Sequence, residues 1–469
     1  MKRIKNVSRF AVVVLALLIA VPTFAARGKA DFTTFVALGD SYGAGVVSGS
    51  LNERHQPFSW PAVIARQVGA KDFVQPLVSF PGIGAELQIV DIVSFPPVIT
   101  PAPGGGQPLL LTYPKPYNNL SIPGANAADL TTLTGKESPT STAAAFAQFI
   151  LRGQGTAVQQ ALAQKPTFIA MWIGGNDLLG AVLSGTPKVM TPTDTFKTAY
   201  NKILDQLTAA APDAGIVVGN IPTSPGALPY LTTVPPVLIN PLTRQPVLLP
   251  NGQPIVFIAD LGDGTVGQLP AGSVVTLPCS SQIASGFGIP EALKADPRFA
   301  ALPNIGKPLP DQCVLTPAES AQIIARANEF NQVINDAASS RNIPVADIKA
   351  LFDQFAAPAG YQVGPFTFSA SFITGGLFGL DGFHLTDAGY IFFANQYIRT
   401  INQAYGTEVP VASITQLFAN NGAFFPESKT TSGGVFMEGM AWTISEEAEQ
   451  QILRFATPVK AHKLRAVGH

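Results

Sequence analysis

The chain has 469 residues, a formal net charge of −1 and only 13% charged residues, which is about half the usual ~25%. It carries no basic stripe, and we therefore expect no nucleic-acid partner. Its 43 glycines and 41 prolines with so few charges predict long, apolar and ordered loops, because disordered segments are usually highly charged.

The first residues have the pattern of an export signal. A basic n-region with Lys2, Arg3 and Lys5 precedes an apolar core from Phe10 to Val21, which is shorter than the ~20 residues of a membrane-spanning helix. Small residues follow, and a cleavage site fits at Thr23-Phe24-Ala25. We expect residues 1–25 to be a signal peptide and the protein to be exported to the periplasm or secreted, with an uncleaved anchor as the alternative.

Segments typical of strands and of helices alternate along the chain. Strands are expected at 33–38, 119–122, 167–173, 216–221 and 343–347, and helices at 59–68, 141–162, 193–210, 317–339 and from His384 to about 406. This alternation predicts an α/β fold in which helices cover both faces of a parallel sheet. Residues 74–119 and 350–380 are interpreted as loops.

Residues 222–317 interrupt this pattern with turns and prolines, and they contain both cysteines. In an oxidising compartment Cys279 and Cys313 are expected to form a disulfide. It would close a loop of about 34 residues and stabilise the fold by roughly 3–4 kcal/mol; two free buried thiols are the alternative. No histidine or further cysteine lies nearby, so no metal site is expected. Residues 407–469 form a C-terminal tail, with a polar helix expected at 445–455.

Ser41 ends the apolar run in Val36-Ala37-Leu38-Gly39-Asp40-Ser41-Tyr42-Gly43. A serine hydroxyl is a weak nucleophile unless the fold exposes it beside a base. Here a strand would hold the backbone still, and the following turn would present the hydroxyl at the edge of the sheet. Ser41 is therefore the candidate nucleophile.

The chain has four histidines, and one has the setting of a catalytic base. His384 follows Asp381 by three residues and precedes a helix that Thr386 or Asp387 can cap. We expect His384 to take the serine proton and Asp381 to orient its ring. The other three are interpreted as non-catalytic: His462 and His469 lie in the basic tail, and His55 in what is read as a solvated loop.

Two further motifs follow strand candidates. Gly124 would let a backbone N–H approach a ligand without interference from a Cβ. Asn176, in Gly174-Gly175-Asn176-Asp177, offers a neutral donor for a developing oxyanion. Each could also be an ordinary turn former. Asp40 and Asp177 are interpreted as structural carboxylates that bind turn N–H groups.

The four motifs that contain Ser41, Gly124, Asn176 and His384 resemble, in residue type and in order, the motifs of the SGNH hydrolases, also called GDSL esterases and lipases. The resemblance spans Asp40 to His384 and implies a flavodoxin-like three-layer sandwich over 31–406, with 222–317 as an insertion. It implies Ser41 as nucleophile, His384 as base and Asp381 as its partner. The oxyanion hole would comprise the N–H groups of Ser41 and Gly124 and the Asn176 side chain. Independently of the resemblance, the sequence has no metal, nucleotide or flavin fingerprint, and no cofactor is expected. Tyr42 stands where this family often has leucine, at a packing position.

The segment Gly39-Asp40-Ser41-Tyr42-Gly43 also fits G-x-S-x-G, the nucleophile elbow of α/β-hydrolases. That fold needs several strands before the serine, whereas Ser41 follows the first strand of the mature chain. Its His-Gly-Gly oxyanion loop is also missing, because no histidine precedes Gly104-Gly105-Gly106. The SGNH arrangement is therefore preferred.

The expected substrate is a small-molecule or lipid acyl ester, with transient contact with a lipid surface. Apolar segments at 234–239 and 256–258 are expected to cover a cleft, and five phenylalanines to surround the approach to His384: Phe366, Phe368, Phe372, Phe378 and Phe383. Ordinary core packing is the alternative for these residues. The alternative functions are a carbohydrate O-acetyl esterase, an acyltransferase and a non-catalytic secreted binding protein.

Overall fold

The computed structural model describes residues 26–93, 97–240, 242–262, 264–414, 434–435 and 443–445. The predicted signal peptide lies outside these ranges, as does the predicted helix at 445–455 apart from its first residue. Within the described ranges, no helix combines the length and apolarity that a membrane crossing requires.

The centre of the fold is a parallel sheet. Its strands are β1 (Phe35–Gly39), β4 (Phe168–Trp172), β5 (Gly215–Gly219) and β10 (Val345–Ala346), in the order β1-β4-β5-β10. Every residue of β1, β4 and β5 is buried. This explains their continuous apolar runs, because both faces of the sheet are covered.

The predicted strand at 119–122 lies along the free edge of β1 without forming a regular strand. The Leu120 N–H donates to the Ala37 carbonyl (2.9 Å), and the Ile122 N–H donates to the Gly39 carbonyl (2.9 Å). Counting this segment as second in chain order gives the order 2-1-3-4-5 of flavodoxin-like folds. The α/β prediction is confirmed.

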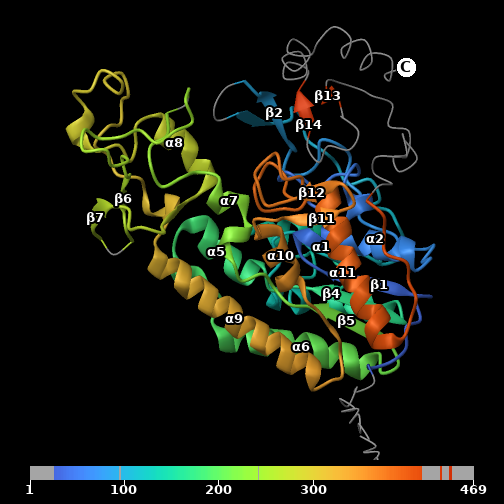
Figure 1. The fold of residues 1–469 in the computed structure, drawn as a ribbon. Helices are drawn as coiled ribbons and strands as arrows, with labels where there is room; N and C mark the ends of the chain where they lie inside the picture. The colour runs from blue at the N-terminus through green and yellow to red at the C-terminus, as the bar shows by residue number, and fades with distance from the viewer. Residues whose placement is uncertain are drawn as a thin grey trace, which may run out of the picture.

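Helices cover both faces of the sheet (Figure 1). On one face, α2 (Trp60–Gln67) and α11 (Asp387–Tyr405) pack together through the stacked rings of Trp60 and Tyr397, 4.7 Å apart. On the other, α6 (Thr193–Ala210) and α9 (Pro317–Ser339) meet through Phe196 and Phe330, 4.0 Å apart. The core therefore lies in two layers, above and below the sheet.

The ends of several helices follow the predicted signals. Thr316 and Glu319 form the capping box of α9, and the Thr386 hydroxyl caps α11 by accepting from the Gly389 N–H at 3.1 Å. Ser59 precedes α2 as predicted, but its hydroxyl donates to Gln75 Oε1 (3.0 Å) instead of capping the helix.

Three segments differ from the sequence interpretation. The helix expected over 141–162 is two helices, α3 (Thr142–Ile150) and α4 (Ala157–Ala163). The break between them holds Gly153 and Gly155 at positive φ, a conformation that ends a helix. The predicted loop 350–380 contains most of α10 (Ile348–Ala356) and a hairpin, β11 (Tyr361–Val363) with β12 (Phe366–Phe368). The predicted loop 74–119 contains the hairpin of β2 (Leu87–Asp91) and β3 (Val98–Pro101).

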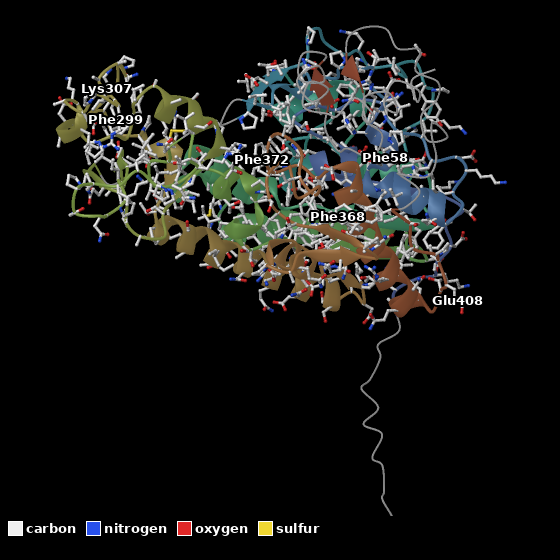
Figure 2. All side chains as sticks on the ribbon, turned by 45° about the horizontal axis from the view of Figure 1, so that its top comes forward. Phe58, Phe299, Lys307, Phe368, Phe372 and Glu408 are labelled. Atoms are coloured by element: carbon white, nitrogen blue, oxygen red, sulfur yellow. A yellow bond between two sulfur atoms is a disulfide. The ribbon has the colours of Figure 1, made fainter. Side chains whose placement is uncertain are left out.

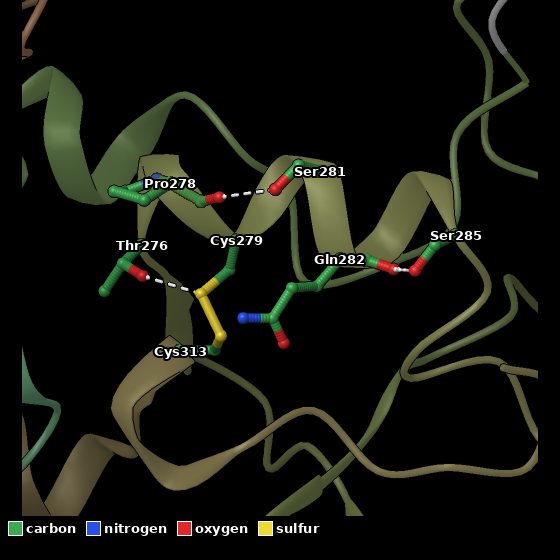
Figure 3. Close-up of a disulfide and its surroundings, with 7 residues drawn as sticks. All are labelled: Thr276, Pro278, Cys279, Ser281, Gln282, Ser285 and Cys313. Atoms are coloured by element: carbon green, nitrogen blue, oxygen red, sulfur yellow. Dashed lines mark hydrogen bonds between the residues drawn. A yellow bond between two sulfur atoms is a disulfide. The ribbon is translucent and has the colours of Figure 1, made fainter.

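Residues 222–317 form an irregular lobe beside the sheet, as Figure 1 shows in green and yellow. Its elements are α7 (Pro229–Thr232), α8 (Ser280–Ala284) and the strand pairs β6–β7 (Ile258–Asp260, Val266–Gln268) and β8–β9 (Val274–Val275, Val314–Leu315). Cys279 and Cys313 form a disulfide with a Cα–Cα distance of 5.6 Å (Figure 3).

The lobe has a hydrophobic core of its own. Leu238, Phe257 and the half-cystine Cys313 belong to this core, and Phe299 lies in it as well; Figure 2 shows Phe299 in the lobe, away from Phe58 and Phe368 in the main body. The expectation that 234–239 and 256–258 cover a cleft is therefore wrong for Leu238 and Phe257. A lobe without long helices needs its apolar residues for its own interior.

The division between the hydrolase domain at 31–406 and the tail stays a prediction. Within the described part of the tail, β14 (Thr443–Ser445) pairs in parallel with β2 and antiparallel with β13 (Gly434–Val435).

Candidate active site

Ser41 stands at the carboxyl end of the first strand of the sheet. It begins the short helix α1 (Ser41–Ala44), which Asp40 caps by accepting the Tyr42 N–H at 3.0 Å. Ser41 is 7% exposed. The turn packs closely on the edge segment, because a Cβ on Gly43 would lie only 2.2 Å from Ser121 Oγ. Only glycine fits there, so the sequence of the turn fixes where Ser41 sits.

Asp381 contacts the ring of His384, as the spacing of three residues between them predicted. Asp381 Oδ2 lies 2.7 Å from His384 Nδ1, while Asp381 Oδ1 accepts the backbone N–H groups of Phe383 (3.1 Å) and His384 (2.9 Å). A further N–H, that of Gly49, donates to Oδ2 at 2.6 Å. The carboxylate therefore fixes both the ring and the backbone of the loop that carries it.

The charge state of Asp381 suits this role. Burial pushes the pKa of its carboxyl upward, but the neighbouring His384 and the N–H groups of Phe383 and His384 outweigh burial and hold the pKa below its usual value. Asp381 is thus ionised at neutral pH. An ionised partner at Nδ1 selects the tautomer that leaves Nε2 to accept a proton.

The serine turn and the histidine loop are direct neighbours. The ring of Tyr42, next to Ser41, lies 5.8 Å from the ring of His384, and the Tyr42 hydroxyl donates to the Phe383 carbonyl. No hydrogen bond joins Ser41 to His384, whose buried Nε2 has no hydrogen-bond partner within the described residues. Without substrate, catalytic hydrogen bonds are often long.

Gly124 and Asn176 both lie at the carboxyl end of the sheet, where Ser41 also lies. Gly124 has a φ of +83°, and a Cβ there would press on Thr142 at 2.9 Å. Asn176, at the start of α5 (Asn176–Ser184), donates one side-chain N–H to the Ala125 carbonyl at 2.9 Å. Its other side-chain N–H can serve a ligand. Asn176 is thereby tied to the residue that follows Gly124.

Comparison with known proteins identifies the family of the chain. The family model described as GDSL-like lipase/acylhydrolase matches residues 35–397. The chain belongs to this family. No curated protein matches the chain.

Solved structures similar to this GDSL hydrolase include three bacterial enzymes. An extracellular lipase from Streptomyces rimosus is 15% identical, covers 79% of this chain and 98% of its own, and has a TM-score of 0.32. Phospholipase A1 from Streptomyces albidoflavus is also 15% identical, with coverages of 81% and 100% and a TM-score of 0.32. A catalytic mutant of an acetylxylan esterase from Geobacillus stearothermophilus is 12% identical, with coverages of 83% and 99% and a TM-score of 0.34.

The other two carboxylates of the GDSL hydrolase motifs bind turn N–H groups, as the sequence predicted. Asp177 Oδ2 accepts the Ala127 N–H at 2.9 Å, and Asp40 caps α1. Burial raises the pKa of Asp40 to about 8 and that of Asp177 to about 6. Asp40 is therefore largely neutral at pH 7 and does not oppose a nearby oxyanion.

The five phenylalanines expected near the base divide into different environments. The Phe383 ring lies 4.3 Å from the His384 ring. Phe368 instead packs on Phe392 at 5.1 Å, and Phe378 is buried in the main core. Phe372 packs on a small cluster around Leu380 and is labelled in Figure 2, and Phe366 is 44% exposed. Core packing is thus the correct interpretation for Phe368 and Phe378.

His55 is not in a solvated loop; that interpretation is wrong. The His55 side chain is fully buried. Its Nδ1 lies 2.9 Å from Asp387 Oδ1, and its Nε2 lies 3.4 Å from Glu86 Oε2. These partners lie far away in sequence, and no local pattern reveals them. Burial opposes a charged ring, but the two carboxylates outweigh it and raise the pKa of His55 to about 10.

We expect the stability of the protein to fall steadily as the pH rises from about 6 to 10. The pKa of His55 is about 10 in the folded protein and ~6.5 when unfolded. Its ion pairs therefore stabilise the fold fully below pH ~6.5 and are lost as the pH approaches 10. Asp40 acts with the same sign, because its pKa is raised to about 8 and deprotonation leaves a buried charge.

Thermal unfolding between pH 5 and 10 measures this dependence. Asp40→Asn keeps the side-chain oxygen that caps α1 and removes the ionisation. This variant should show a flatter slope up to about pH 8 and an unchanged slope above it. A melting temperature that is constant or rises with pH would contradict the assignment.

Proposed function

We propose that the protein is a secreted carboxylic ester hydrolase, with Ser41 as nucleophile, His384 as base and Asp381 as the residue that orients His384. The observation that carries this proposal is the setting of His384. Its Nδ1 faces an ionised carboxylate at 2.7 Å, and its Nε2 is left without a hydrogen-bond partner among the described residues, beside the turn of Ser41.

The proposed reaction proceeds through an acyl-enzyme. Ser41 Oγ forms a bond to the carbonyl carbon of the ester while its proton moves to His384 Nε2. The tetrahedral intermediate then breaks its bond to the leaving alcohol, which takes that proton. Water repeats the two steps, releasing the acid and restoring the serine. An alcohol in place of water would give acyl transfer.

The oxyanion of each intermediate would accept hydrogen bonds from the N–H groups of Ser41 and Gly124 and from Asn176. The tie between Asn176 and the Ala125 carbonyl at 2.9 Å supports this proposal, because it fixes the amide and costs no reorganisation during the reaction. Neutral donors suit this position, since they stabilise the negative charge only when it develops.

Asn176→Ala is expected to lower kcat by about 10²–10³-fold, the usual cost of one oxyanion donor. Steady-state hydrolysis of p-nitrophenyl esters measures the effect. Asn176→Asp keeps the shape but replaces the donor with a carboxylate, so it should be at least as slow. If both variants kept wild-type kcat, Asn176 would have no role in the oxyanion hole.

Labelling with a fluorophosphonate probe tests the proposed function directly. The probe should modify one peptide, the one that contains Ser41, because phosphonylation requires a serine activated by a base. His384→Ala should abolish the labelling. A label on another serine, or labelling that does not depend on His384, would overturn the assignment.

Fatty-acyl esters are the proposed substrates. Phe383 supports this, because its half-buried ring lies beside the base and packs against Tyr230 of α7 (6.0 Å between centroids). The Tyr230 N–H also donates to the Gly382 carbonyl at 2.8 Å, so the start of the lobe contacts the histidine loop with apolar side chains. A panel of p-nitrophenyl esters from acetate to palmitate tests this; activity restricted to acetate would favour a carbohydrate O-acetyl esterase.

A further inference from the structure

Tyr42 connects the nucleophile turn to the loop of the base. Its hydroxyl donates to the Phe383 carbonyl, so the residue after Ser41 binds the residue before His384. Leucine, which the family often has at this position, has no donor and would leave this carbonyl without the bond. Tyr42 therefore makes a polar contact between the two segments in addition to packing its ring.

The Tyr42 ring is held firmly enough to place its hydroxyl. Tyr42 is 9% exposed, and its ring contacts those of Trp172 (4.9 Å), Tyr390 (5.8 Å) and Phe393 (6.1 Å). Burial raises the pKa of Tyr42 well above its usual value. The hydroxyl therefore keeps its proton and remains a donor over the working pH range.

Other hydrogen bonds hold both ends of this loop. At its histidine end, the His384 N–H donates to Asp381 Oδ1 and the Gly379 N–H donates to the His384 carbonyl, both at 2.9 Å. The Gly49 N–H donates to Asp381 Oδ2 at 2.6 Å, and the Leu380 N–H donates to Ser48 Oγ at 3.0 Å. The Phe383 carbonyl belongs to the peptide that joins Phe383 to His384. Asp381 holds the N–H of this peptide and Tyr42 holds its oxygen, so the two bonds together fix the plane of the peptide from which the His384 side chain extends.

We propose that Tyr42 is a positioning residue for the reaction of this protein: its hydroxyl fixes the Phe383–His384 peptide so that His384 Nε2 faces Ser41. This inference rests on the proposed function. Tyr42, the residue after the nucleophile, thus acts on the base. Loss of its hydroxyl should slow the chemical step equally for every acyl ester.

Tyr42→Phe keeps the ring and removes the hydrogen bond. We expect kcat to fall about 10- to 100-fold, the scale of a small misplacement of a catalytic group, with KM nearly unchanged. The loss should be equal for acetyl and longer acyl esters, and the rate of fluorophosphonate labelling should fall in proportion. Tyr42→4-aminophenylalanine restores a donor at the same place and should recover most of kcat.

Tyr397→Phe is the matched control. Tyr397 is also buried, with no exposed surface, and its hydroxyl likewise donates to a backbone carbonyl, that of Met171 at 2.8 Å, in the middle of the core. Tyr397→Phe should lower the melting temperature about as much as Tyr42→Phe does but leave kcat unchanged. The comparison separates an effect on positioning from an effect on stability.

Three outcomes would overturn the inference: wild-type kcat in Tyr42→Phe, a change in acyl-chain preference without a uniform loss, or an equal loss of kcat in Tyr397→Phe. Each is distinct from failure of the proposed function, which would appear as ester turnover retained in Ser41→Ala.

Discussion

Ser41→Ala is expected to lower kcat for ester hydrolysis by about 10⁶-fold, the cost of losing the nucleophile in a serine hydrolase. The physical reason is that no acyl-enzyme can form, and only substrate binding and the oxyanion donors remain. His384→Ala should cost a similar factor, since the hydroxyl without a base is a weak nucleophile. Hydrolysis of p-nitrophenyl esters by purified protein measures both.

The double variant is the sharper form of this test. Residues that act as a unit are strongly non-additive, and Ser41→Ala with His384→Ala should therefore be no slower than either change alone. Ser184→Ala is the control, because it removes a serine hydroxyl at a half-buried site on α5, where the hydroxyl donates to the Gly180 carbonyl at 2.7 Å; it should keep full activity. Turnover that survives in Ser41→Ala would favour a non-catalytic role for Ser41.

Asp381→Asn is expected to lower kcat by about 10⁴-fold while the protein still folds. The Asn oxygen can take the place of Oδ1, which accepts the N–H groups of Phe383 and His384. The amide nitrogen then stands where Oδ2 faces His384 Nδ1 at 2.7 Å. An N–H directed at Nδ1 places the ring proton on Nε2, so that Nε2 cannot accept the serine proton.

The same substitution places a second donor opposite the Gly49 N–H, which now donates to Oδ2 at 2.6 Å. We therefore also expect a lower melting temperature. Asp353→Asn, which removes an exposed carboxylate paired with Lys349, is the control and should keep full activity. If Asp381→Asn retained wild-type kcat, His384 would not depend on Asp381 for its tautomer.

Much of the fold was predictable from local patterns. Apolar runs such as Phe35–Gly39 and Phe168–Trp172 identify buried strands, and the carboxyl ends of parallel strands meet at one edge of the sheet. Ser41 and Asn176 each follow such a strand closely, so their convergence could be expected from the amino-acid sequence alone. The Asp381–His384 contact was predictable for a different reason, because three residues separate the two side chains within one loop.

Tertiary structure alone decided the features that depend on partners far away in the chain. His55 looks solvated in its own segment, yet Glu86 and Asp387 make its burial favourable, because a charge can leave water only when opposite charges replace its hydration. The apolar residues of the lobe could have faced a cleft; they fill a core because the lobe has no other. Tyr42 looks like a packing residue in the sequence, since no pattern along the chain shows that its hydroxyl meets the carbonyl of Phe383.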